Sequence, residues 1–161
     1  MQISISRVRS TRYIGVEIDE NLSWNEHVKF VCDSLVKYIG IFRHIKHFVT
    51  RKILTQIYFA FVYSRISYGI EVYGSCASSI LNKIQTMQNK LLKILCRRNY
   101  RYSTNALHKE LNLLKVHDIY KQHILLFVYS CLTGNTIDIF TNYYETKSKS
   151  QYPNTRNKNC L

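Results

Sequence analysis

The sequence predicts a mainly α fold of about five helices, with a small N-terminal β hairpin or strand pair and a disordered C-terminal tail. Three observations lead to this fold class. The chain has 161 residues and is 46% hydrophobic, which suits one domain with a core. It contains one Pro and five Gly, so few residues would interrupt long helices. Apolar residues also recur at spacings of three and four over most of the chain, as they do on one face of a helix.

The N-terminal segment alternates apolar and polar residues, which predicts short strands over residues 2–7 and 13–18. Residues 19–21 (D-E-N) then supply a turn. Ser23 and Glu26 form the S-x-x-E pattern of a capping box, in which the two side chains satisfy free amides at a helix start. The first helix is therefore expected from about Trp24 to Phe48.

Two amphipathic helices are predicted in the first half of the chain. The first has one continuous apolar stripe, made of Val28, Val31, Leu35, Ile39, Phe42 and Ile45. The second begins after Thr50, a favourable N-cap residue. Its apolar band is wider, so we expect it to be the most buried element; the band comprises Ile53, Leu54, Ile57, Tyr58, Phe61 and Val62.

The second half is predicted to hold three more helices. Residues 67–74 contain two glycines and predict a turn or irregular connection. A helix follows from Ser78 to about Cys96, and a short one starts after Ser103 or Thr104. The last runs over 118–132 and ends at Gly134 in the C′ position. The apolar face of the 78–96 helix comprises Ile80, Ile84, Met87, Leu91 and Leu95.

Beyond Tyr144 the sequence is polar and basic without periodicity, so too little apolar surface can be buried to offset the entropy of ordering. This composition predicts disorder. The chain is expected to divide into a β element over 1–20, a helical domain over 21–134 and a basic disordered tail over 135–161.

The charge is strongly positive and unevenly placed. The net charge is +13, and residues 34–109 contain thirteen Lys or Arg against one acid, Glu71. A basic, aromatic-rich domain favours nucleic acid as the partner, ahead of an acidic protein and then an anionic membrane surface. Charge that serves only solubility is the alternative.

One set of basic and aromatic residues is the candidate nucleic-acid site. Lysines 83, 90 and 93 with arginines 97 and 101 follow spacings of seven, three, four and four, which predicts cations along one helix face and its extension. Tyr100 and Tyr102 alternate with arginines and are candidates for stacking. A plain basic loop is an equal alternative. The full candidate set is Lys83, Lys90, Lys93, Arg97, Arg98, Tyr100, Arg101 and Tyr102.

No catalytic residue, metal site or cofactor site is predicted in this chain. Two-metal polymerisation requires carboxylates close together, whereas the four aspartates are dispersed, at positions 19, 33, 118 and 138. His44 and His47 are one turn apart but have no third ligand at suitable spacing. Five cysteines without a CxxC pair and the lack of a long apolar run predict an intracellular protein, in nucleus or cytoplasm, with no membrane partner.

Several blocks together resemble a known family. Residues 10–19 (S-T-R-Y-I-G-V-E-I-D) and the following N-L-S-W-N-E-H-V are similar to the segment that closes the palm in Jockey-like non-LTR retrotransposon reverse transcriptases. The resemblance continues through 39–45, 57–74, 81–95 and 106–120, in the family's order. It therefore spans roughly residues 7–134.

The resemblance implies the C-terminal, thumb-side part of an RNA-directed DNA polymerase. Residues 1–20 would end the palm, and 21–134 would form a thumb that grips a template–primer duplex without sequence specificity. Tyr13, Ile14 and Gly15 would lie on the primer side. The family's aromatic-Ala-Asp-Asp box, its Mg²⁺ and the rest of the palm and fingers would lie upstream of Met1. The rivals are a domesticated basic interaction module, which would bind an acidic partner, and a remnant without function.

Overall fold

The computed structural model describes residues 7–136 and residue 140, and it is mainly helical with an N-terminal β hairpin, as predicted. The chain divides into two compact units, residues 1–120 and 121–161. Nearly all of the tail predicted over 135–161 and nearly all of the strand expected at 2–7 lie outside the described residues. The predicted three-part division stays a prediction. The elements are β1 (Ser10–Tyr13), β2 (Val16–Asp19), α1 (Asn25–Ile45), α2 (Arg51–Ile57), the π-helix η1 (Tyr58–Tyr63), α3 (Ser64–Ser67), α4 (Ile70–Tyr73), α5 (Ser78–Leu95), α6 (Thr104–Leu111) and α7 (Val116–Leu132).

The hairpin is confirmed, but its strands differ from those predicted. β1 and β2 are antiparallel, with Ser10 opposite Asp19 and Tyr13 opposite Val16. Ile14 and Gly15 form the loop between them with φ of 44° and 78°. Two residues with positive φ are typical of the type I′ turns that match strand twist. The single strand predicted over 13–18 is wrong because the chain reverses at Ile14 and Gly15.

The start of α1 is organised by Asp19 rather than by the predicted capping box. The Asp19 carboxylate accepts hydrogen bonds from the backbone amides of Asn21 at 3.1 Å, Ser23 at 3.0 Å and Trp24 at 2.9 Å. The Ser23 hydroxyl donates to the same carboxylate at 3.2 Å. Trp24, with φ of 63°, is the residue before the helix and makes no side-chain cap. One acid therefore joins the hairpin to the helix.

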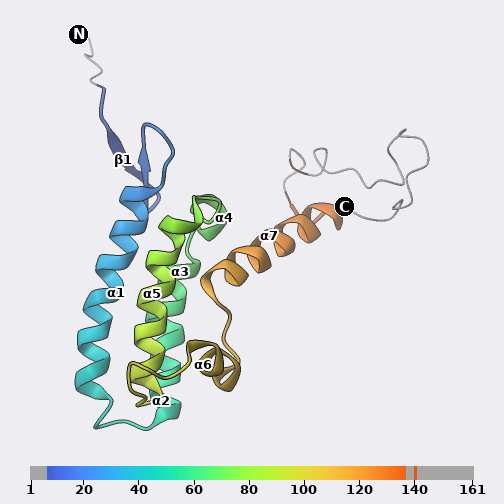
Figure 1. Ribbon diagram of the computed structural model, residues 1–161. Coiled ribbons are helices and arrows are strands. Elements are labelled where there is room, and N and C mark those ends of the chain that lie inside the picture. Colours follow the sequence, from blue (N-terminus) through green and yellow to red (C-terminus); the bar gives the residue numbers. More distant parts are fainter. Residues whose placement is uncertain (1–6, 137–139, 141–161) are drawn as a thin grey trace. The chain divides into compact units, whose positions relative to one another are not determined.

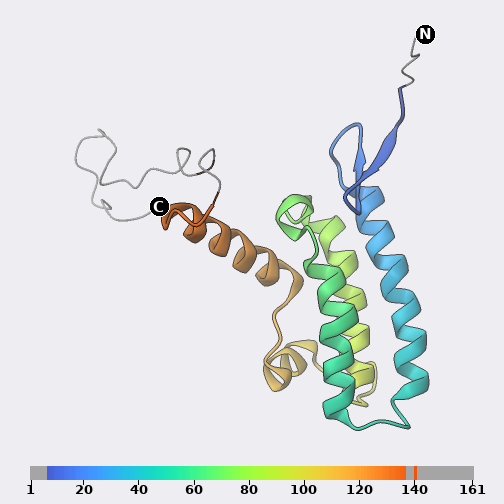
Figure 2. The ribbon, with the colours of Figure 1, turned by 180° about the vertical axis from the view of Figure 1, so that it is seen from behind.

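In the first unit, α1, α5 and the column formed by α2, η1 and α3 lie side by side (Figures 1 and 2). The predicted stripe of α1 is confirmed, since its first five members are buried and Ile45 packs against them half-buried. The face of α5 is wider than predicted. Ile84, Leu91 and Leu95 are buried as expected, and Leu81, Gln88 and Leu92 join them.

The α2–η1–α3 column buries a residue at every fourth position: Leu54, Tyr58, Val62, Ile66 and, beyond α3, Ile70, all 0% exposed. A stripe with this spacing drifts around an ordinary helix of 3.6 residues per turn. The wider π turn of η1 counteracts that drift and keeps the stripe facing the core. Thr50 is the predicted cap, and its hydroxyl accepts from the Ile53 amide at 3.4 Å. Ile53 and Phe61 are exposed, so the buried band is narrower than expected.

The connection predicted over 67–74 is a turn followed by the short helix α4. Gly69 has φ of 66°, and Gly74 is packed so tightly that an added Cβ would lie 2.3 Å from a ring carbon of Tyr120.

In the second unit, α7 ends as predicted. Gly134 has φ of 72°, and the Asn135 amide donates to the Ser130 carbonyl at 2.9 Å, the pattern of a Schellman motif.

Candidate nucleic-acid interface

The predicted basic set divides between a helix and a loop. Lys83 and Lys90 are exposed on α5, and the Lys93 ammonium group donates to the Tyr100 carbonyl. The helix ends at Leu95. Arg97, Arg98 and Arg101 therefore lie in the loop after α5, not on a continuation of its face.

Arg97 closes one end of the bundle. Its φ is 52°, which turns the chain away from the helix axis. Its guanidinium donates to the carbonyl oxygens of Lys46 at 2.6 Å and Val49 at 3.4 Å. These carbonyls belong to the turn after α1, where helix carbonyls lack partners and favour a cation. Arg97 thus has a structural role in addition to any binding role.

The other loop arginines are paired with aromatic rings. The Arg98 guanidinium lies 4.8 Å from the centre of the Tyr102 ring. Arg101 donates from Nε to the Tyr100 hydroxyl at 2.8 Å and lies 5.4 Å from that ring. Tyr100 is 74% exposed, whereas Tyr102 packs half-buried against the core. Of the two predicted stacking residues, Tyr100 alone presents most of its ring to solvent.

The structure adds residues that the sequence analysis did not assign to this site. The α1–α2 turn and the end of α5 enclose a pocket of about 460 Å³, whose lining includes His47, Phe48, Arg51 and Arg97. Arg51 also forms an ion pair with Glu110 at 2.7 Å. The R-H-I-K-H run is about 50 residues from Arg97 in the sequence, so local spacing could not predict that the two segments meet. We call Lys46, His47, Arg51, Arg97, Arg98 and Arg101 the basic end.

The hairpin residues implied by the resemblance lie beyond the opposite end of α1 (Figure 1). Tyr13 and Ile14 are exposed. The Tyr68 hydroxyl donates to the Ile14 carbonyl at 2.6 Å, and its ring would lie 3.2 Å from a Cβ added to Gly15. Because α1 has 21 residues, about 30 Å separate the hairpin from the basic end.

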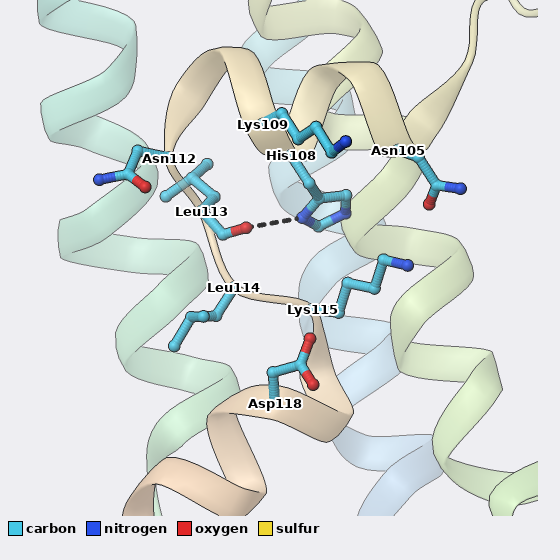
Figure 3. A pocket seen from close by; sticks show the side chains of 8 residues that line it. All are labelled: Asn105, His108, Lys109, Asn112, Leu113, Leu114, Lys115 and Asp118. Atoms are coloured by element: carbon cyan, nitrogen blue, oxygen red, sulfur yellow. Dashed lines mark hydrogen bonds between the residues drawn. The ribbon is translucent and has the colours of Figure 1, made fainter.

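A second pocket, of about 480 Å³, lies beside α6 (Figure 3). Buried His108 lines it, with Nδ1 3.1 Å from the Leu113 carbonyl, and burial lowers the pKa of this imidazole. Behind it, Gln88 is fully buried and donates to the Tyr58 hydroxyl at 2.9 Å and the Leu114 carbonyl at 3.0 Å. Gln85 accepts from the Val116 amide at 2.8 Å. These bonds anchor the α6–α7 connection to α5, so we interpret the buried groups as structural.

Metal-ligand clusters and membrane-spanning helices are two further features that bear on function. No three His, Cys, Asp or Glu side chains in the described part of the chain are grouped so that they could hold a metal ion. None of the helices described is both long and apolar enough to cross a bilayer.

Two proteins of Drosophila melanogaster match the chain. "Probable RNA-directed DNA polymerase from transposon BS" is 24% identical over 124 residues, which cover 75% of this chain and 14% of that protein. The chain is related to transposon RNA-directed DNA polymerases. "Probable RNA-directed DNA polymerase from transposon X-element" is 23% identical over 127 residues, 76% of this chain and 14% of its own length. The chain thus spans about one seventh of each relative. No protein-family model and no solved structure matches it.

These two matches confirm that the chain is similar to transposon reverse transcriptases, as the resemblance implies. The assignment to the Jockey-like group and to the thumb stays a prediction.

Proposed function

We propose that this chain is the thumb-side part of a Jockey-like transposon reverse transcriptase and that it grips a template–primer duplex without sequence specificity. The catalytic aspartates and the Mg²⁺ ions they bind would belong to the palm of the parent enzyme, outside this chain. The observation that carries the proposal is the basic end. There the structure gathers cations from two segments that are about 50 residues apart in sequence, as the 51-residue separation of Lys46 and Arg97 illustrates.

The basic end suits a phosphate backbone better than a base edge. Arg98 and Arg101 are exposed and held beside tyrosine rings, which limits the conformational entropy lost on binding. Lys83 and Lys90 extend the positive surface along α5. Contacts of this kind fix the position of a duplex and carry no sequence information. Tyr100 would stack on an exposed sugar or base.

The hairpin would supply a second contact, on the primer side, through Tyr13, Ile14 and Gly15. Ile14 supports this because it is 69% exposed and adopts a φ of 44°. Positive φ is strained for a β-branched residue, and such strain is concentrated at functional sites.

The salt dependence of duplex binding tests the proposal. The full chain is titrated into a labelled DNA duplex of about 20 base pairs at several NaCl concentrations, because each phosphate contact adds about 0.9 to the slope of log K against log salt. Arg98→Gln/Arg101→Gln should make the slope shallower by up to about 1.8, because it removes at most two phosphate contacts. Arg97 is left intact because it holds the α1 turn.

Lys29→Gln/Lys37→Gln is the matched control, since it removes two exposed cations from α1, away from the basic end. Its slope should equal that of the wild-type chain. Salt-insensitive binding, or equal loss of slope in both double variants, would contradict a duplex grip by the basic end. Tight binding to polyglutamate instead of the duplex would favour an acidic protein partner.

A further inference from the structure

We infer that a groove between α1 and the α2–η1–α3 column binds one unpaired nucleotide base. The groove encloses about 340 Å³ and is lined by Tyr38, Ala60, Phe61, Ser64, Arg65 and Tyr68. None of these residues belongs to the basic end. The inference concerns single-stranded nucleic acid and rests on this groove, not on the basic end.

The groove is a continuous second face of the column. Ser64, Arg65 and Tyr68 follow Phe61 by three, four and seven positions, so the four residues line one side of the helix, next to the stripe that enters the core. Tyr38 of α1 closes the other side, with its ring centre 5.9 Å from that of Phe61. Phe61 is 53% and Tyr68 48% exposed. Large aromatic rings are thus open to a ligand instead of being used in the core.

The groove walls are held in place before any ligand binds. The Tyr68 hydroxyl is bonded to the Ile14 carbonyl, and Phe61 projects from η1. Single π-helical turns often occur at functional sites. Within this π turn, Tyr58 and Val62 are buried, whereas Phe61 is exposed. A fixed aromatic wall lowers the entropic cost of stacking.

Charge and size indicate the class of ligand. Arg65 lines the groove, and its guanidinium lies 5.5 Å from the centre of the Phe30 ring. The Arg12 guanidinium lies 4.8 Å from the centre of the same ring. No acidic residue lines the groove. Aromatic faces bind bases of any sequence, and an arginine beside them suits the attached phosphate. The volume is near the lower limit for ligand pockets and is large enough for one base.

The experiment uses an oligothymidylate of about eight nucleotides with one central 2-aminopurine, within the range that single-strand sites occupy. Stacking on an aromatic ring quenches this fluorophore. The full chain is expected to quench it, and Phe61→Leu should weaken that binding by about 5- to 150-fold, the effect of losing one base–ring stack. Arg65→Gln should weaken it as well by removing the phosphate contact. Phe59→Leu is the matched control, because Phe59 is 45% exposed on the same π-helix but does not line the groove.

A second variant, Ala60→Leu, fills the groove while it retains every ring and the cation. It should abolish quenching with unchanged helical content by circular dichroism. Equal quenching by the wild-type, Phe61→Leu and Ala60→Leu chains would overturn the inference, as would no quenching by the wild-type chain.

The two proposals fail separately. Phe61→Leu should leave the salt slope for duplex DNA unchanged, whereas Arg98→Gln/Arg101→Gln should leave quenching of the single strand unchanged.

Discussion

Asp19 shows how a single side chain can connect two elements. Its carboxylate accepts from three backbone amides and one hydroxyl between β2 and α1. The hydrogen bond from the Ser23 amide is the largest cause that lowers the pKa of this carboxyl below 3.8, and the amides of Trp24 and Asn21 add to it. These bonds favour the ionised form because only the carboxylate accepts all of them.

The lowered pKa predicts a pH-dependent stability. A carboxyl whose pKa is lower in the folded chain stabilises it fully above the unfolded value of 3.8, and this contribution is lost as the pH falls through the folded pKa. We expect the urea midpoint to fall as the pH is lowered below about 5, and to fall less steeply in Asp19→Asn. Parallel pH profiles for the two chains, measured by circular dichroism, would contradict this role.

At the scale of elements, replacing two glycines by alanine should change the stability in opposite directions. Gly74 follows α4, and a Cβ there would lie 2.3 Å from the Tyr120 ring and 2.5 Å from the Ile70 carbonyl. Gly74→Ala should therefore reduce the free energy of unfolding by about 1–3 kcal/mol, the usual cost of overpacking. Gly40 lies in the middle of α1 with nothing within 4 Å of an added Cβ. Gly40→Ala should stabilise the chain by roughly 0.5–1 kcal/mol, because alanine loses less entropy in a helix.

Urea unfolding of the two variants measures both changes. A stabilising Gly74→Ala would show that the close approach of Gly74 to Tyr120 is not formed, and a destabilising Gly40→Ala would contradict the open space beside Gly40.

The elements also show what periodicity can predict. Val28, Val31 and Leu35 follow the spacing of an ordinary helix, so the buried side of α1 could be read directly from the sequence. The π turn of η1 could not be read from the sequence, because apolar spacing alone does not distinguish a π turn from an α turn. The positive φ of Ile14 could not be predicted either, because isoleucine rarely adopts a positive φ.

The candidate site was predictable in composition but not in arrangement. The cations around Arg97 stand out in the sequence. Their junction with the α1–α2 turn depends on the hydrogen bond from Arg97 to Lys46, which joins residues 51 positions apart. Local spacing carries no information about such a contact.

For the molecule as a whole, repulsion among positive charges should outweigh ion pairing. The net charge is +13. In the part of the chain that the structure describes, ion pairs such as Arg7–Glu20, Arg12–Glu17 and Arg51–Glu110 are partly exposed, where such pairs contribute little. Raising NaCl from about 0.01 to 0.1 M shortens the screening length from about 30 to 10 Å. The thermal unfolding midpoint should therefore rise with salt.

A less charged chain provides the comparison. Lys29→Glu/Lys37→Glu lowers the net charge of +13 by four, at exposed positions of α1. Its midpoint should rise less steeply with salt than that of the wild-type chain. A midpoint that falls as salt is added would mean that attraction, not repulsion, dominates the electrostatics of the folded state.

The pairing of α1 with α5 also has a consequence for synthesis on the ribosome. α1 is made first, yet the contact from Arg97 that closes its end requires a residue translated 51 positions after Lys46. At about 5–20 residues per second, this delay lasts roughly 3–10 s. During that interval the apolar stripe of the nascent α1 lacks its main packing partner, so a chaperone that binds exposed apolar helices would find its substrate in this part of the chain before α5 emerges.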